Sequence, residues 1–242
     1  MKGFFVTGTD TDIGKTVVTA SLAAWYRGRG HRVGVLKPVQ TGSSLSDRGE
    51  CCDDAEFLRR NSGCGEPDNL TNPYRFRLPA SPHLAARLEE VEIDPSVIGD
   101  AFNALASRYR PVLVEGAGGL LVPYTEDYLT IDLVQELNVP LLIVARPGLG
   151  TINHTLLTVE TALNRGLKLL GIVFNRSKSG KPGDEDMVIE EDNKRIIEKL
   201  SGVKVWGTIP YDREICGGSW ETLARKTSPI WDAHLLQKDN RN

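Results

Sequence analysis

The segment from Gly8 to Thr16 brings glycine, lysine and threonine together in the order Gly-Thr-Asp-Thr-Asp-Ile-Gly-Lys-Thr. An apolar run precedes it and a helical pattern follows it; strand, glycine-rich turn, Lys-Thr and helix are the parts of a P-loop. The backbone N–H groups of such a turn and the positive end of the helix dipole bind phosphate. We expect Lys15 to contact the β- and γ-phosphates and the Thr16 hydroxyl to bind Mg²⁺. The predicted nucleotide-binding loop comprises Asp12, Ile13, Gly14, Lys15, Thr16 and Val17.

The spacing inside this loop differs from the usual P-loop pattern. Five residues, rather than four, separate Gly8 from Gly14, and Thr9 stands where a glycine is usual. An ordinary glycine-rich turn before a helix is the alternative interpretation. The Gly-Lys-Thr sequence at the first strand-to-helix junction favours phosphate binding.

Two aspartates, Asp10 and Asp12, lie where a polyphosphate would bind. Like charges repel one another, and more strongly where water is excluded. One interpretation is that Asp10 only organises the turn through its own backbone. A second is that Asp12 points to solvent. A third is that one acid faces a cation besides the metal, such as a substrate ammonium group beside the γ-phosphate. The residues alone leave these interpretations open.

Lys37 ends a second apolar run, Val-Gly-Val-Leu-Lys, and Pro38 follows it. Ligands of parallel α/β sheets bind at the carboxyl ends of the strands, so we expect Lys37 to point into the phosphate site. A surface lysine is the alternative. Thr41 and Gly42 follow and are expected to line the same crevice.

Glu115 ends a third run, Pro-Val-Leu-Val-Glu, and glycines follow at 116, 118 and 119. An acid at a strand end beside a P-loop is expected to hold Mg²⁺ together with the loop hydroxyl. The glycines let a ligand approach the backbone closely. Asp53 and Asp54 open the next helix, where acids also stabilise the helix dipole; a second carboxylate near Mg²⁺ would suit one of them.

Two further segments are weaker candidates. Asn175 ends the run Leu-Leu-Gly-Ile-Val-Phe-Asn and could pair with a base edge, although a turn role is as plausible and the guanine-reading Asn-Lys-x-Asp is absent. The segment from Gly148 to His154 precedes a helix and could bind an anion, or could simply cap that helix. His83 and His154 have no catalytic partner nearby in sequence, so no hydrolase triad is indicated.

Short apolar runs alternate with helical stretches along the chain. Several runs are continuous and β-branched, as in strands that helices cover on both faces. The expected strands are Phe4–Thr7, Val33–Lys37, Val112–Glu115, Leu141–Ala145, Leu169–Asn175 and Val205–Ile209. The expected helices lie near 15–28, 53–61, 96–109, 130–138, 153–165 and 187–201. We predict one α/β domain over residues 1–242 with a P-loop NTPase-like fold, a doubly wound, mostly parallel sheet with helices on both faces.

The remaining segments carry little pattern. The polar stretch 42–50 is expected to be a mobile loop, and 177–185 an exposed one. The tail after Gly217 is expected to hold at most one short terminal helix. The cysteines, at 51, 52, 64 and 216, are expected to be reduced thiols; a metal cluster of Cys51, Cys52 and Cys64 is the alternative.

Composition and charge are ordinary for a globular protein. The chain has 242 residues and a formal net charge of −3, which indicates no nucleic-acid partner. No run approaches the length of a transmembrane helix, so no membrane partner is expected. The first strand and its loop begin directly after Met1-Lys2, which argues against a cleavable signal peptide and favours a cytoplasmic location.

Together these motifs resemble those of the dethiobiotin synthetases, the ATP-dependent carboxylases of the biotin pathway. The matching pieces are the loop from Gly8 to Thr16, Lys37-Pro38-Val39 with Thr41-Gly42, Asp54, Asn72-Pro73-Tyr74, Ser81-Pro82-His83, the segment from Val114 to Gly119, the segment from Gly150 to His154, Asn175, and Ile209-Pro210. They extend over most of the chain in family order and spacing. Relatives often carry Glu in place of Asp12 and Ser in place of Thr41, but both departures keep the functional group.

The resemblance implies a reaction. The substrate would be 7,8-diaminononanoate (7,8-diaminopelargonate), which carries two amines and a tail carboxylate. CO₂ would add to one amine to give a carbamate, and ATP would phosphorylate it to a mixed carbamic–phosphoric anhydride. The second amine would then close the cyclic urea, releasing dethiobiotin, ADP and phosphate. The required cofactor is Mg²⁺, with ATP as co-substrate.

The resemblance also implies residue roles, and a homodimer whose interface binds the tail carboxylate. Catalysis is assigned to Lys37, Lys15 and Thr11, and Mg²⁺ binding to Thr16, Asp54 and Glu115. Substrate binding is assigned to Thr11, Asp12, Lys37, Thr41, Gly118, Gly150 and Asn153. Nucleotide binding beyond the loop is assigned to Asp54, Glu115, Gly116, Ala117, Gly118, Asn175, Arg176, Pro210, Tyr211 and Asp212.

The competing hypothesis is a nucleotide-switched ATPase of the partitioning type, which shares the broad fold. Such proteins carry a second lysine early in the loop, where this chain has Thr9, Asp10 and Thr11. The missing lysine and the two acids argue against it. A related ligase-like enzyme that amidates or adenylates a different acid is a third possibility. The P-loop predicts γ-phosphoryl transfer, which gives ADP rather than AMP.

Overall fold

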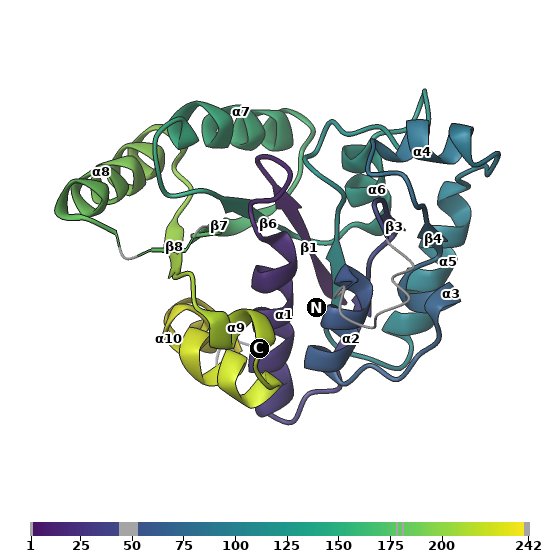
Figure 1. Ribbon diagram of the computed structural model, residues 1–242, viewed down its shortest axis with the longest axis horizontal. Helices are drawn as coiled ribbons and strands as arrows, with labels where there is room; N and C mark the ends of the chain where they lie inside the picture. Colours follow the sequence, from purple (N-terminus) through teal and green to yellow (C-terminus); the bar gives the residue numbers. More distant parts are fainter. Residues whose placement is uncertain (1, 44–52, 178, 181, 240–242) are drawn as a thin grey trace.

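The computed structural model describes residues 2–43, 53–177, 179–180 and 182–239. A six-stranded sheet crosses the molecule in the order β2-β5-β1-β6-β7-β8, and every neighbouring pair is parallel (Figure 1). The strands are β1 (Gly3–Gly8), β2 (Gly34–Leu36), β5 (Val112–Glu115), β6 (Leu141–Ala145), β7 (Leu169–Asn175) and β8 (Val205–Ile209). All six predicted strands are present, which confirms the predicted α/β sheet.

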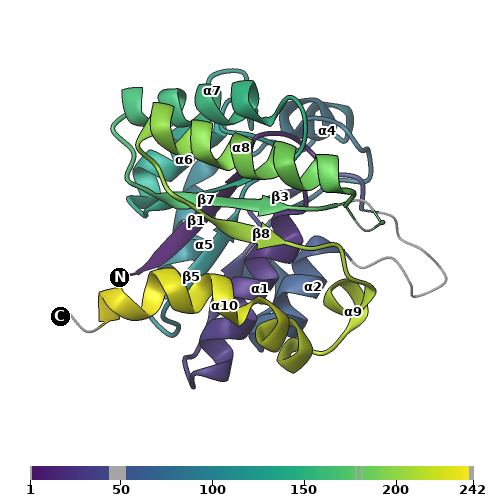
Figure 2. The ribbon, with the colours of Figure 1, turned by 90° about the vertical axis from the view of Figure 1, so that its left-hand side faces the viewer.

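Helices lie on both faces of this sheet. In the view of Figure 2, α6, α7 and α8 lie above the sheet, and α1, α2 and α10 lie below it. The helices are α1 (Lys15–Gly28), α2 (Asp54–Ser62), α3 (Asp68–Thr71), α4 (Pro82–Leu88), α5 (Pro95–Ala106), α6 (Thr130–Leu137), α7 (Thr151–Asn164), α8 (Asp184–Ser201), α9 (Arg213–Gly217) and α10 (Trp220–Asp239). Within the described ranges, no helix is both long and apolar enough to span a bilayer.

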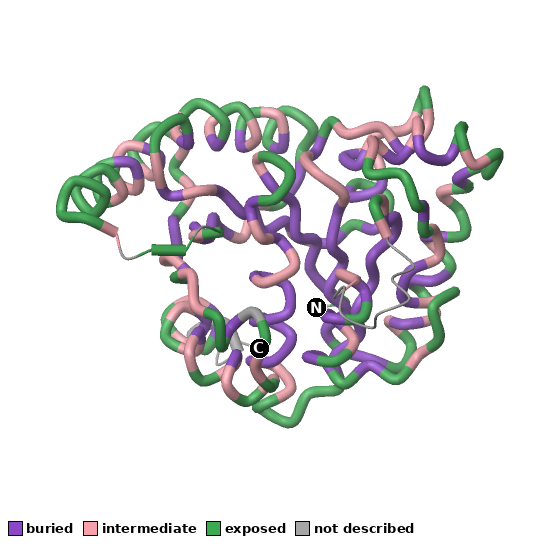
Figure 3. The backbone as a smooth tube through the Cα atoms, in the orientation of Figure 1, coloured by how far each residue is buried: buried purple, intermediate pink, exposed green. Residues whose placement is uncertain are grey.

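The sheet is the centre of the hydrophobic core, and the outer turns of the helices are exposed (Figure 3). Every residue of β1, β5 and β6 is buried, which explains why these strands read as continuous apolar runs. Two strand ends carry polar groups into this environment: Glu115 is the last residue of β5, and Lys37 follows β2 directly.

The expectation of a short terminal helix was wrong. Helix α10 has 20 residues and packs along α1, the helix that begins in the P-loop. Its buried stripe repeats every four residues, at Leu223, Thr227, Trp231 and Leu235. One member of the stripe is polar, and Pro229 inside the helix is normally a helix breaker, so the sequence pattern is weak here.

Several short elements were also missed. Strands β3 (Val39–Gln40) and β4 (Tyr74–Arg75) form a second, two-stranded parallel sheet, and α3, α4 and α9 are brief helices. The predicted loop 177–185 ends early, because α8 begins at Asp184. The mobile loop predicted at 42–50 lies, from residue 44 on, outside the described residues, as do Cys51 and Cys52. Cys64 is a buried free thiol.

Candidate active site

The P-loop turn joins β1 to α1 and depends on a glycine at its end. Gly14 has a φ of 85°, in the left-handed region, and a Cβ there would lie 2.1 Å from Asn175 Nδ2. The same Asn175 amide donates to the Ile13 carbonyl at 2.9 Å. Strand β7 therefore supports the loop from behind, and only glycine fits between them.

Asp10 organises the turn, as the first of the three interpretations predicted. Its Oδ1 accepts from the Thr11 backbone N–H at 2.8 Å, and its Oδ2 pairs with Arg146. Its backbone carbonyl accepts from Lys15 Nζ at 3.0 Å. Protein groups thus pair with both oxygens of the Asp10 carboxylate. Of the two acids, Asp12 is therefore the one available to contact a ligand.

Lys15 and Asp12 present opposite charges to the same space. Burial lowers the pKa of Lys15, and the nearby Lys37 ammonium lowers it further. Asp12 adopts a positive φ of 56° and is exposed. That left-handed conformation is uncommon for a residue with a side chain but accessible to Asp.

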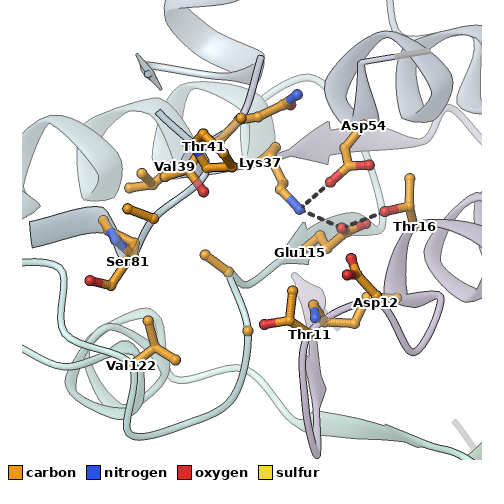
Figure 4. Close-up of a pocket in the computed structure, with 18 of the residues that line it drawn as sticks. Thr11, Asp12, Thr16, Lys37, Val39, Thr41, Asp54, Ser81, Glu115 and Val122 are labelled. Carbon is orange, nitrogen blue, oxygen red and sulfur yellow. Dashed lines mark hydrogen bonds and ion pairs between the residues drawn. The ribbon is translucent and has the colours of Figure 1, made fainter. Parts of the chain in front are cut away.

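A compact cluster of charges joins the ends of β2 and β5 to helices α1 and α2 (Figure 4). Lys37 Nζ lies 2.6 Å from Glu115 Oε1 and 2.8 Å from Asp54 Oδ2. The Thr16 hydroxyl donates to the same Glu115 Oε1 at 2.9 Å. Lys37 and Glu115 are 5% and 0% exposed, so this is a buried pair.

The electrostatics of the cluster follow from that burial. Burial opposes the charge on Lys37, but the carboxylates of Glu115 and Asp54 outweigh it and raise the pKa of Lys37 above its ordinary value. Burial likewise opposes the charge on Asp54, yet the Lys37 ammonium keeps the Asp54 pKa below its ordinary 3.8. Lys37 and Asp54 are therefore both charged at neutral pH.

The cluster also fits a hard divalent cation. Thr16, Asp54 and Glu115 offer only oxygen atoms as metal ligands. Of these, Glu115 Oε2 is buried without a hydrogen-bond partner among the described residues. Mg²⁺ typically takes one or two carboxylates and keeps several waters. No group of three or more His, Cys, Asp or Glu side chains able to hold a metal occurs in the described part of the chain, so a closed structural metal site is not found there.

These groups open into a cleft of about 810 Å³. Eleven of the predicted site residues line it: Thr11, Asp12, Gly14, Lys15, Thr16, Lys37, Thr41, Asp54, Glu115, Ala117 and Gly118. The lining residues that sequence reasoning did not assign to the site include Gln40, Ser81, Pro82 and Val122. Ser81 and Pro82 belong to a motif that the family resemblance had marked, and this was the available signal.

The other predicted residues lie outside the lining of this cleft. Ile13 and Gly116 are buried behind it, and Val17 follows the loop in α1. Arg176 pairs with Glu190, and Asp212 caps α9 and pairs with Lys226. The remaining predicted residues away from the lining are Gly150, Asn153, Asn175, Pro210 and Tyr211. The structure therefore gathers Lys37 and most of the residues predicted to bind phosphate and metal into one cleft, and the residues predicted to contact the base and the tail carboxylate lie outside its lining.

Comparison with known proteins gives the family. A family model described as an AAA domain matches residues 2–217. An ATP-dependent dethiobiotin synthetase of Bacillus cereus (strain ATCC 14579) is 42% identical over 211 residues, which cover 87% of this chain and 84% of the relative. The enzyme of the same name from Nitrosopumilus maritimus (strain SCM1) is 36% identical over 226 residues, which cover 93% of this chain and 96% of the relative.

Solved structures show the fold without adding to the function. The structure of pNOB8 ParA bound to nonspecific DNA superposes with a TM-score of 0.60, covering 100% of this chain and 99% of that one, at only 12% sequence identity. This likeness confirms the P-loop NTPase-like fold. Because the family match and the two curated relatives extend over most of the sequence, the chain belongs to the family of ATP-dependent dethiobiotin synthetases.

Proposed function

We propose that this ATP-dependent ligase carboxylates 7,8-diaminononanoate with CO₂ and closes it to dethiobiotin, forming ADP and phosphate. The observation that carries the proposal is the cleft itself, in which Lys15, Lys37 and Asp12 face one space. Such a site offers two cations to anionic groups and one carboxylate to a cationic amine. A nucleotide phosphate, a carbamate and a diamine together have those charges.

The proposed reaction has three steps. One amine attacks CO₂ and loses a proton, giving a carbamate. A carbamate oxygen then attacks the γ-phosphorus of ATP, and the bond to the β-phosphate oxygen breaks to release ADP. The second amine attacks the carbonyl carbon of the mixed anhydride, loses a proton and expels phosphate, which leaves the cyclic urea.

Lys37 and Lys15 would neutralise the charge that moves in the second step. Lys37 Nζ lies at the buried end of the cleft, and Lys15 Nζ lies on the P-loop side. Phosphoryl transfer is accelerated mainly by positioning and by fixed charges, so two buried ammonium groups suit this step. Thr11 lines the cleft beside them and would orient the carbamate.

Asp12 would bind the second ammonium or amine of the substrate. Its backbone is held in a turn that Asp10 and Arg146 stabilise, and its side chain is exposed in the cleft (Figure 4). Thr41 and Gly118 line the same cleft and would contact the carbon chain. This assignment explains why an acid stands inside a phosphate-binding loop.

Thr16, Asp54 and Glu115 would hold Mg²⁺, which supplies charge neutralisation at the β- and γ-phosphates when it is bound. The unpartnered Glu115 Oε2 supports this set of ligands. Lys37 Nζ now lies against both carboxylates, so the protein itself balances their charge.

The nucleotide base would extend from the P-loop toward the ends of β7 and β8. Asn175 contacts the P-loop backbone there, and Arg176 N donates to the Ile209 carbonyl at 3.0 Å, which joins the two strand ends. Pro210, Tyr211 and Asp212 follow β8 directly and would border the base. The backbone loop at 116–118 would face the phosphates from the other side.

We further propose a cytoplasmic homodimer in which the tail carboxylate of the substrate meets the start of α7. Gly150 is the N-cap of α7 and Asn153 lies exposed in its first turn, where backbone N–H groups favour an anion. Exposed leucines near this surface support an interface: Leu149 is 91% exposed, and Leu121 and Leu157 line one groove at 56% and 54%. The net charge of −3 gives no support for nucleic-acid binding.

The deciding experiment measures ADP release with and without the diamine and bicarbonate. The proposal expects release only when both are present, together with a product whose mass equals the diamine plus CO₂ minus one water. A nucleotide-switched ATPase of the partitioning type, which shares the fold, would hydrolyse ATP at the same rate in all mixtures. Turnover that ignores the diamine would refute the proposal.

A further inference from the structure

The main chain at Lys37 is held from both sides by one short segment. Lys37 N donates to the Thr71 carbonyl at 2.7 Å, and Asn72 Nδ2 donates to the Lys37 carbonyl at 2.7 Å. Pro38 has no N–H, so the main chain cannot continue the ladder of β2 at this point. Asn72 is only 4% exposed, and a buried carbonyl needs a partner. The Asn72 amide therefore fixes the direction in which the chain leaves Lys37.

A second set of contacts runs from Asn72 to the start of α2. Arg75 Nε donates to Asn72 Oδ1 at 3.3 Å, and Arg75 Nη2 lies 2.5 Å from Asp53 Oδ2. The other oxygen, Asp53 Oδ1, accepts from Ala55 N at 3.1 Å and caps α2. Asp54 is the first residue of that helix, so the Asp53 carboxylate helps to set where the Asp54 side chain begins.

These contacts close a ring. Lys37 Nζ reaches Asp54 Oδ2 at 2.8 Å on the cleft side, while Asn72, Arg75 and Asp53 connect the two backbones on the far side. None of the three connecting residues is among the lining of the cleft. The guanidinium is central, because its planar fork serves the amide and the carboxylate at the same time, which a lysine ammonium cannot do with the same geometry.

We propose that Asn72, Arg75 and Asp53 form a positioning bridge that sets Lys37 and Asp54 relative to each other. The inference rests on the proposed function, in which Lys37 acts on the carbamate and Asp54 on the metal. None of the three residues lines the cleft, so we expect none of them to touch a reactant. Their effect is on where two reacting charges stand, and a misplacement of about 1 Å can cost about 100-fold in rate.

The test begins with Asn72→Ala and a matched control, Asn61→Ala. Asn61 is also a buried asparagine, 1% exposed, and its Nδ2 donates to the Phe57 carbonyl at 2.8 Å, at the far end of α2. Both variants lose a buried amide and are expected to melt at a lower temperature. Only Asn72→Ala is expected to lower kcat, by about 100-fold, while the Kd of ATP stays within about twofold.

A second pair covers the case in which Asn72→Ala fails to fold. Arg75→Lys keeps the charge at a side chain that is 36% exposed but removes the fork, and is expected to lower kcat by about tenfold. Arg108→Lys, which changes an exposed arginine that pairs with Glu66, is its control and is expected to leave kcat unchanged.

An NMR measurement decides the inference independently of activity. The buried Lys37 ammonium, held by two carboxylates, is expected to give a slowly exchanging ¹⁵Nζ signal, which Lys37→Met identifies by removing it. The signal should shift or broaden in Asn72→Ala and Arg75→Lys and stay unchanged in both controls. An unchanged signal with an unchanged kcat in Asn72→Ala would overturn the bridge, as would equal kcat losses in Asn72→Ala and Asn61→Ala. Absence of diamine-dependent turnover in the wild type would refute the proposed function instead, and the NMR comparison would still decide the bridge.

Discussion

The phosphate end of the site and the segment proposed to hold the base are built differently. At the phosphate end, Lys37 and Glu115 are 5% and 0% exposed and their contacts link four elements. At the base segment, the ion pair of Lys226 with Asp212 has side chains that are 24% and 29% exposed. Water screens exposed pairs and makes them weak, whereas a buried charge depends wholly on its partner. The difference teaches that burial ties the charges of Lys37 and Glu115 to fixed partners, whereas water reaches the ion pair in the segment proposed to hold the base.

Removing Lys37 should have the largest effect at the phosphate end. Lys37→Ala is expected to lower kcat on the order of 10³-fold, because a fixed charge at the transferring group is lost. The variant should remain folded, but its free energy of unfolding should fall by about 3–5 kcal/mol, because the buried Glu115 side chain loses its partner. Circular dichroism, denaturant titration and ADP release check the three expectations. An active Lys37→Ala enzyme would remove the central mechanistic assignment.

The next largest effect tests the support of the P-loop by β7. Gly14→Ala is expected to weaken ATP binding by about 10–100-fold, because its Cβ would lie 2.1 Å from Asn175 Nδ2 in a loop with positive φ. Gly30→Ala is the matched control: Gly30 has a φ of 82°, and nothing lies within 4 Å of its Cβ position. Calorimetric titration with an ATP analogue should give a higher Kd for Gly14→Ala than for Gly30→Ala. Equal ATP affinities would contradict the steric argument.

Asp12→Asn tests the acid in the loop. Loss of one charge-assisted contact to an ammonium group should weaken diamine binding by about tenfold and leave ATP binding nearly unchanged. Asp10→Asn should instead affect both ligands, because Asp10 pairs with Arg146 and holds the turn. Titration with each ligand separately gives the comparison, and equal losses for both ligands in Asp12→Asn would contradict the ammonium interpretation.

A smaller effect is expected in the pH dependence of stability. The Lys37 ammonium keeps the pKa of Asp54 below its ordinary 3.8 despite burial, so the folded state holds fewer protons than the unfolded state. The resulting stabilisation is fully present above pH 3.8 and is lost as pH falls through the lowered pKa. Denaturant titration in the presence of a chelator should show that the difference in free energy of unfolding between wild type and Asp54→Asn is smaller at pH 3 than at pH 7. A larger difference at pH 3 would contradict the lowered pKa of Asp54.

The smallest effect is expected at the base segment. Lys226→Met removes a half-buried partner of Asp212 and Glu214 and should change the Kd of ATP by less than about threefold. Competition between ATP and GTP in the same variant would show whether this segment selects the base. A large loss of ATP affinity would mean that the partly exposed ion pair contributes as strongly to the site as the buried one.

The residues at strand ends could be predicted from the sequence because they follow continuous apolar runs. Lys37, Glu115 and the P-loop were located this way, and a parallel sheet brings such ends together. The second metal-side acid was less certain, since Asp53 and Asp54 are neighbours; the structure gives capping to Asp53 and the contact with Lys37 to Asp54. The local sequence pattern thus predicts which residues lie at the carboxyl ends of the strands. The geometry of the helix N-cap then determines which of two adjacent acids points toward Lys37.

Contacts between distant segments could not be predicted in this way. The bridge through Asn72 and Arg75 depends on β3 and β4, which are two residues each and carry no periodic signal. Helix α10 was underestimated because Thr227 interrupts its apolar stripe and Pro229 lies inside it. In each case tertiary packing stabilises what local preference leaves undecided.

The contact between Asn175 and Ile13 has a consequence for how the enzyme would tell nucleotides apart. The Asn175 amide donates a hydrogen bond to the P-loop backbone and, in the proposed arrangement, lies beside the base. A base that displaces the Asn175 side chain would then also displace the P-loop. A non-cognate nucleoside triphosphate would therefore lower kcat as well as binding affinity, and the discrimination would be measurable even at saturating nucleotide.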